Sequence, residues 1–153
     1  MLLEKINQDV KNAIKEGDVF CVGVLRMMIA VFKNKEIEKR GKGENPKLSD
    51  EEIVEILFKE IKKRKEAVQI YSNAGRKDLT DKELKEISII QNYLPVQAGS
   101  EEIEKIVMEA IEATGAFSQK DFSRVMAAAA KKLKGRAESA LIVELIKKKL
   151  GNE

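Results

Sequence analysis

The spacing of apolar residues constrains this chain more than any other feature, because it follows the period of an α-helix from one end to the other. The pattern is clearest over residues 125–150, where two apolar stripes of helical period lie on either side of Gly135. Glycine readily takes the left-handed conformation in which many helices end. This stretch therefore predicts two helices joined by a turn at Gly135.

Five more stretches upstream repeat the pattern, and no strand is expected anywhere. The expected helices cover about residues 2–15, 19–40, 49–74, 80–94, 100–115, 118–133 and 141–150. Capping signals that predict where helices begin are Ser49 with Glu52, Thr80 with Glu83, and the single residues Ser100 and Ser118.

A break in the pattern divides the chain. No helical stripe runs through Leu94–Gly99, and Pro95 disfavours helix at the residue before it. We therefore expect an all-α fold in two parts, a four-helix N-terminal bundle over residues 1–94 and a three-helix C-terminal domain over residues 99–153. The short loops indicate that neighbouring helices pack antiparallel.

The composition narrows the chemistry. The chain has no histidine, which is the commonest general base and a frequent metal ligand, so we expect no metal site. It has no GxxxxGK loop for a nucleoside triphosphate, and no cofactor is expected. The one cysteine, Cys21, excludes an internal disulfide and favours a reducing compartment, which we take to be the cytoplasm.

The most apolar run, residues 19–32, is interrupted by Arg26. A membrane-spanning helix needs about 20 apolar residues, so this run is too short, and the acidic residues that precede it do not fit a signal peptide. We expect a helix buried on nearly all sides, with no membrane partner. Cys21 and the pair Met27–Met28 are then core side chains, and Arg26 forms a structural ion pair.

For the other charged helical segments, a structural role is considered before a ligand-binding role. Glu60 and Arg64 interrupt an apolar stripe and predict a buried or bordering ion pair. Residues 33–40 are expected to project into solvent. The run Lys62–Lys65 is either a solvated helix face or a nucleic-acid contact, and both interpretations stay open.

The C-terminal third segregates its charges. Residues 118–151 hold nine basic and three acidic residues, whereas residues 99–117 hold five acidic residues and one lysine. Such segregation creates a directional field that attracts a polyanion, although lysines at helix C-termini also complement the helix dipole. The candidate RNA contacts are Lys131, Lys132, Lys134, Arg136, Lys147 and Lys148. No aromatic residue lies among these six, which favours phosphate and shape recognition of folded RNA over base stacking.

Several sequence runs together resemble the YqeY family over essentially the whole chain. Residues 62–97 contain AGRxDL and YLP, the C-terminal stretch contains KGRA, and residues 24–40 resemble the second helix of that family. The matching positions in the first run are Arg64, Lys65, Glu66, Gly75, Arg76, Asp78, Leu79, Glu86, Ile87, Tyr93, Leu94 and Pro95. At Glu138–Ser139 the chain departs from the Asp-Gly or Asn-Pro that often starts the family's last helix, so that helix start stays open.

The last third of the chain also resembles the tail of GatB, the tRNA-contacting subunit of the glutamine-dependent amidotransferase. In GatB the tail grips tRNA, while amide transfer takes place in a separate domain that this sequence does not resemble. The resemblance implies a non-catalytic protein, with no catalytic residue, whose C-terminal domain binds tRNA or a tRNA–protein complex such as an amidotransferase or a tRNA synthetase. It assigns no role to the signature residues Arg64, Gly75, Arg76 and Asp78.

Two alternatives stay open. The first is a component of glutamine-dependent amidotransfer, which would be a carbon–nitrogen ligase with glutamine as the amide donor. Such an enzyme needs an activated nucleophile with a base within reach, and Cys21 has no histidine with which to pair. The second is a protein-interaction adaptor that binds no RNA and uses the charged helices around residues 33–40 and 51–66.

Overall fold

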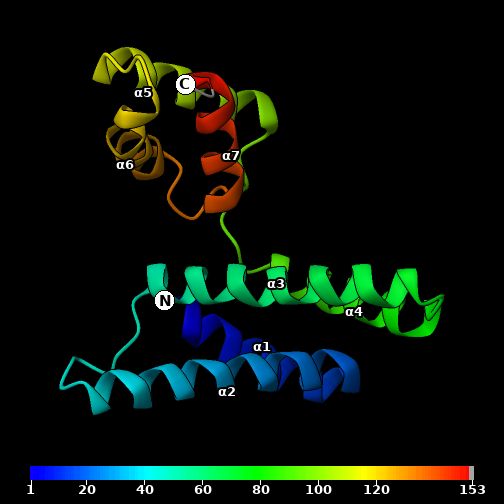
Figure 1. Ribbon diagram of the computed structural model, residues 1–153. Coiled ribbons are helices and arrows are strands. Elements are labelled where there is room, and N and C mark those ends of the chain that lie inside the picture. The colour runs from blue at the N-terminus through cyan, green and yellow to red at the C-terminus, as the bar shows by residue number, and fades with distance from the viewer. Residues whose placement is uncertain (152–153) are drawn as a thin grey trace. The chain divides into compact units, whose positions relative to one another are not determined.

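The computed structural model describes residues 1–151. That part of the chain contains helices and no strand, so the all-α prediction is confirmed (Figure 1). The chain divides into two compact units, Met1–Leu94 and the part from Pro95 onward. The helices are α1 (Leu2–Glu16), α2 (Val19–Gly41), α3 (Asp50–Asn73), α4 (Lys77–Gln91), α5 (Ser100–Thr114), the 3₁₀ turn η1 (Gln119–Asp121), α6 (Phe122–Lys132) and α7 (Ser139–Leu150).

The four helices of the N-terminal unit bury one apolar core. Helix α3 packs along α4, and α1 packs along α2. The fully buried members include Phe32 and Leu57, and side chains of this size each stabilise the fold by about 1.5–3 kcal/mol when buried. The buried core residues are Ile6, Val24, Leu25, Met28, Phe32, Leu48, Ile53, Leu57, Ile61, Ile87 and Ile90.

Helix α2 is buried on one face only, so the expectation that it is surrounded is wrong. Met28 is buried, whereas Val19 is 81% exposed and Met27 is 37% exposed. Arg26 is exposed and makes no ion pair within residues 1–151, so the ion pair predicted for it is also wrong. The physical reason is that a four-helix unit leaves one side of every helix in solvent. Neither α2 nor any other described helix combines the length and apolar character needed to cross a membrane.

Two further expectations for α2 need correction. Cys21 is only partly buried at the edge of the core. Lys39 is buried, and its Nζ donates to Glu52 Oε1 over 2.6 Å, so residues 33–40 do not all project into solvent. Since Glu52 belongs to the first turn of α3, this ion pair ties the end of α2 to the start of α3.

The capping signals have mixed outcomes. The box at Ser49 is confirmed, because the Ser49 hydroxyl accepts from Glu52 N over 3.2 Å and Glu52 Oε2 accepts from Ser49 N over 2.8 Å. The box predicted at Thr80 is wrong. Gly75 turns the chain so sharply that α4 already begins at Lys77, and the Thr80 hydroxyl inside its first turn donates to Arg76 O.

The C-terminal unit packs α5, α6 and α7 around a smaller core. Its buried residues are Ile103, Val107, Ala110, Val125, Ala129, Leu133, Ala137, Ile142 and Ile146. Ser100 is the first residue of α5 and not its cap, because Gly99 occupies the N-cap position. Ser118 precedes η1, which continues into α6, and the Asp121 carboxylate accepts from the backbone nitrogens of Phe117 and Ser118.

No helix covers the segment between Asn92 and Gly99, so the predicted helix-free stretch around Pro95 is confirmed. Val96 within it is 85% exposed. We expect a non-specific protease such as subtilisin to cut near Val96 and leave two resistant fragments, because exposed backbone without helix is the preferred site of nicking. The separately produced segments 1–94 and 95–153 should each show helical circular dichroism. Failure of both segments to fold would contradict the division into two domains.

Candidate nucleic-acid interface

The six candidate RNA contacts do not lie together on one surface. The turn group, at the junction of α6 and α7, is Lys131, Lys132, Lys134 and Arg136, and the other two candidates, Lys147 and Lys148, lie in the last turn of α7. The Gln119 side chain, just before α6, donates to Lys147 O over 3.1 Å, so the start of α6 lies beside the end of α7. With 11 residues in α6, a rise of about 1.5 Å per residue separates the two groups by about 15 Å along the hairpin.

Two members of the turn group, Lys132 and Arg136, form ion pairs with carboxylates of α5. Within residues 1–151, ion pairs that connect α5 to the rest of the unit include Lys132 with Glu109 at 3.0 Å, Arg136 with Glu102 at 2.8 Å, and Lys149 with Glu104 at 2.5 Å. The hydrogen bond from Lys132 lowers the pKa of Glu109. The acidic and basic segments therefore neutralise each other in part, and the directional field expected from the sequence is weaker than the residue counts suggest.

The KGRA run anchors the start of the C-terminal unit. Gly135 O accepts from the Gln97 side chain over 3.2 Å, and Arg136 O accepts from Ala98 N over 2.7 Å. Arg136 Nε also donates to Val96 O over 3.3 Å. These bonds give Arg136 a structural role that its charge alone did not reveal, and they weaken its candidacy as a phosphate contact.

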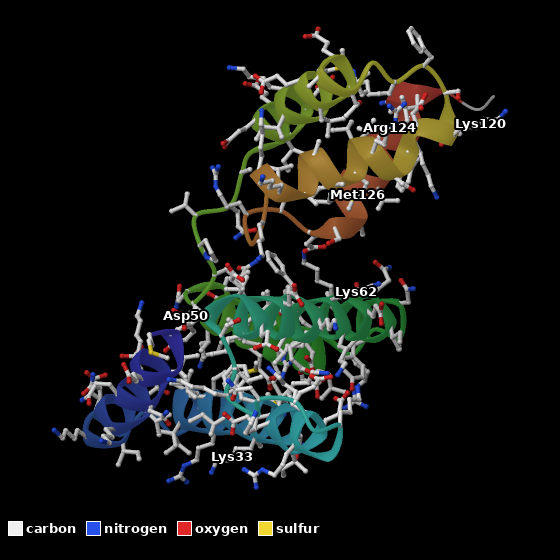
Figure 2. All side chains as sticks on the ribbon, turned by 90° about the vertical axis from the view of Figure 1, so that its left-hand side faces the viewer. Lys33, Asp50, Lys62, Lys120, Arg124 and Met126 are labelled. Atoms are coloured by element: carbon white, nitrogen blue, oxygen red, sulfur yellow. The ribbon has the colours of Figure 1, made fainter. Side chains whose placement is uncertain are left out.

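The basic side chains at the end of α7 differ in whether they form ion pairs. Lys147 and Lys148 are exposed, and so is Lys120 from η1. Arg124 from α6 lies at the same end and pairs with Asp121 (Figure 2). We call Lys120, Arg124, Lys147 and Lys148 the α7-end group. Sequence reasoning left Lys120 and Arg124 out of the candidate set, although the expected antiparallel hairpin already placed the start of α6 at this end.

The signature residue Arg64 is buried in the N-terminal unit. Its guanidinium donates to Glu60 Oε2 over 2.8 Å, to Glu86 Oε2 over 3.0 Å and to the sulfur of Met27 over 3.2 Å. Burial alone would raise the pKa of Glu60, but hydrogen bonds from Lys63 and Arg64 outweigh it, and the pKa is lowered. The predicted ion pair at Glu60 and Arg64 is confirmed, and it leaves no role for Arg64 in nucleic-acid contact.

The other signature residues build the turn between α3 and α4. Gly75 has a φ of 68°, a value that residues with a Cβ rarely adopt. Arg76 N then donates to Tyr71 O over 2.9 Å, which closes the end of α3. The exposed Arg76 guanidinium makes two hydrogen bonds of 3.1–3.2 Å to the Asp78 carboxylate and lowers its pKa. Gly75, Arg76 and Asp78 thus share one turn, whereas Arg64 lies apart from them.

Tyr93 is a further signature residue with a structural contact. Its hydroxyl donates to Asp9 Oδ2 over 2.8 Å and so connects the residues after α4 to α1. Burial and this hydrogen bond raise the pKa of Tyr93. Cys21 is shifted in the same direction, because burial and the nearby Asp18 raise the pKa of its thiol. A catalytic nucleophile needs the opposite shift.

Comparison with known proteins identifies the family of this chain. The family model described as Yqey-like protein matches residues 3–150. The chain belongs to the YqeY family. In this YqeY protein, the signature positions Arg64 and Gly75 form a buried ion-pair network and a glycine turn, respectively.

Several relatives of this YqeY protein carry the name "Altered inheritance of mitochondria protein 41, mitochondrial", and three of them illustrate the similarity. The one from Vanderwaltozyma polyspora is 31% identical over 127 residues, 78% of this chain and 66% of the relative. The one from Pyrenophora tritici-repentis is 26% identical over 153 residues, 98% of this chain and 79% of the relative. The one from Kluyveromyces lactis is 32% identical over 107 residues, 68% of this chain and 55% of the relative.

These names overturn the expectation of a cytoplasmic location, because they describe the relatives as mitochondrial proteins. That expectation rested on the single cysteine, which favours a reducing compartment. A single cysteine does not distinguish one reducing compartment from another, so it is no evidence for the cytoplasm in particular.

Proposed function

We propose that this YqeY protein is a non-catalytic RNA-binding protein whose C-terminal unit binds tRNA phosphates through Lys120, Lys147 and Lys148 of the α7-end group. The observation that carries the proposal is that Lys120 and Lys147 are exposed and make no ion pair within residues 1–151. The exposed Lys148 acts on Glu104 only as a nearby charge, because Lys149 forms the ion pair with that carboxylate. An ammonium group without an internal carboxylate partner exchanges only water and counterions for a phosphate. The resemblance of this unit to the GatB tail supports tRNA as the first RNA to test.

The α7-end group is a better candidate than the turn group. Lys132 and Arg136 would have to give up the carboxylates of Glu109 and Glu102 before they could contact phosphate. Lys131 is exposed and adds positive charge at the other end of the hairpin. Because the two ends are separated, an RNA that used both would have to follow the length of α6 and α7.

The proposal predicts a specific salt dependence. Lys147→Glu combined with Lys148→Glu should weaken tRNA binding by at least about tenfold at low salt and reduce the salt slope by about two, since each lost phosphate contact removes about 0.9 from it. The measurement is a titration with tRNA at about 50 and 200 mM salt. Circular dichroism should show unchanged helix content, because both side chains are exposed on the last turn of α7.

A matched control separates local contact from net charge. Lys11→Glu combined with Lys15→Glu changes two exposed lysines of α1 and alters the net charge by the same amount. This control should bind tRNA almost as well as the unaltered protein. Equal weakening by both double variants would show only general charge attraction, and no weakening by the α7 variant would favour the adaptor alternative.

A further inference from the structure

The most exposed large apolar side chain in residues 1–151 is Phe117, at 92%. It lies between α5 and η1, in a loop that is held by hydrogen bonds. Ala116 N donates to Ile111 O over 3.2 Å, and Phe117 N donates to Asp121 Oδ2 over 3.0 Å. The ring therefore stands in solvent on a fixed backbone.

The contacts of the residues that follow Phe117 bring this loop beside the end of α7. Gln119, two residues further along, donates to the backbone oxygens of both Lys147 and Gly151. Asp121, which binds Phe117 N, also pairs with Arg124. The Asp121 carboxylate is thus already engaged by a guanidinium and by backbone N–H groups.

We propose that Phe117 is a stacking platform for one unpaired RNA base, with Lys120, Lys147 and Lys148 contacting the phosphates on either side of that nucleotide. This inference rests on the proposed RNA binding and adds recognition of single-stranded nucleotides to it. Unpaired bases of loops and chain ends stack on aromatic rings in this way, and every base offers a suitable face. The basic pattern of residues 118–151 favours phosphate and shape recognition, and Phe117 lies just before that stretch.

The charges around the ring favour nucleic acid over a protein partner. An exposed phenylalanine that anchors a protein interface usually has apolar neighbours, and lysine is depleted at such interfaces. Here the exposed neighbours include Lys120 and, through Gln119, the lysines at the end of α7. An exposed aromatic ring on a loop whose surroundings are basic suits a base with its phosphates better than an apolar protein surface.

The test compares two probes of equal charge. One is an unstructured RNA of about ten nucleotides, and the other has the same backbone with abasic riboses. Phe117→Ala should weaken binding of the first probe about tenfold and leave binding of the abasic probe unchanged, because stacking needs a base. Phe117→Trp should retain the affinity. Val96→Ala, which truncates another exposed apolar side chain of this unit, should change neither affinity.

The other possible results would overturn the stacking site, the proposed RNA binding, or both. Equal affinity of the unaltered protein and Phe117→Ala for the base-bearing probe would overturn the stacking site while leaving phosphate binding in place. Equal weakening for both probes would also overturn it, because the ring would then act through the fold. If the unaltered protein binds neither these probes nor tRNA, both the stacking site and the proposed function fail. If Phe117→Ala instead abolishes capture of a protein with RNA affinity intact, the surface belongs to a protein partner.

Discussion

Arg64→Ala is expected to destabilise the N-terminal unit by about 3–5 kcal/mol, because removing the central cation breaks a buried ion-pair network. Glu86 would lose its paired cation, and Glu60 would keep only the exposed Lys63. Glu60 and Glu86 would then face each other across α3 and α4 without the guanidinium that lies 2.8 Å from one and 3.0 Å from the other. Urea denaturation followed by tyrosine fluorescence measures the loss. The chain has two tyrosines and no tryptophan, and both tyrosines, Tyr71 and Tyr93, belong to this unit.

The matched control for this change is Arg76→Ala, which removes an exposed arginine that also pairs with a carboxylate. Water replaces the partner of an exposed ion pair, so the denaturation midpoint should hardly move. Arg64→Met combined with Glu60→Gln and Glu86→Gln should recover part of the stability lost in Arg64→Ala, because no buried charge is then left alone. A midpoint for Arg64→Ala equal to that of the unaltered protein would contradict the role assigned to the network.

The same network predicts how the difference depends on pH. The pKa of Glu60 is lowered in the folded state from its ordinary value of 4.5. Its contribution to stability is therefore present above pH 4.5 and is lost as the pH falls through the folded-state pKa. The stability difference between the unaltered protein and Arg64→Ala should accordingly shrink when denaturation is repeated under acidic conditions.

The sequence predicts only the part of this network whose residues are close together in the chain. Glu60 and Arg64 are one helical turn apart, so their pairing follows from the period of α3. Glu86 is 22 residues further along, and its approach depends on how α4 packs against α3. The capping box at Ser49 is local and was predictable, whereas the start of α4 depends on the turn that Gly75 makes.

The candidate site shows the same limit. Basic residues that lie close together in sequence were assigned to one surface, but the hairpin places Lys131 and Lys147 at opposite ends. The carboxylates that pair with Lys132 and Arg136 belong to α5, more than 20 residues earlier in the sequence. Only tertiary packing decides which lysines stay available to a ligand.

Gly135→Val is expected to destabilise the C-terminal unit by about 3 kcal/mol, the upper end of the range for a side chain forced into the left-handed region. Gly135 has a φ of 72°, and a β-branched residue is the least tolerant of such a value. A unit of about 60 residues rarely gains more than about 3–5 kcal/mol from its core, so most of its stability would be lost. Hydrogen exchange read by mass spectrometry should show lost protection in α6 and α7.

The loss of stability in Gly135→Val should stay within the C-terminal unit. Hydrogen exchange should distinguish it from a variant that only binds tRNA less tightly. Gly135 O and the neighbouring Arg136 O hold Gln97 and Ala98, so Gly135→Val should also speed proteolysis near Val96, whereas exchange in α1–α4 should not change. Gly99→Ala is the matched control, because Gly99 has a φ of −68° and no atom within 4 Å of an added Cβ.

Lys147→Glu with Lys148→Glu should weaken tRNA binding and keep normal hydrogen exchange. Gly135→Val should both weaken tRNA binding and increase hydrogen exchange. Normal exchange in Gly135→Val would mean that the turn accepts another backbone conformation, and the structural role given to the KGRA run would be wrong.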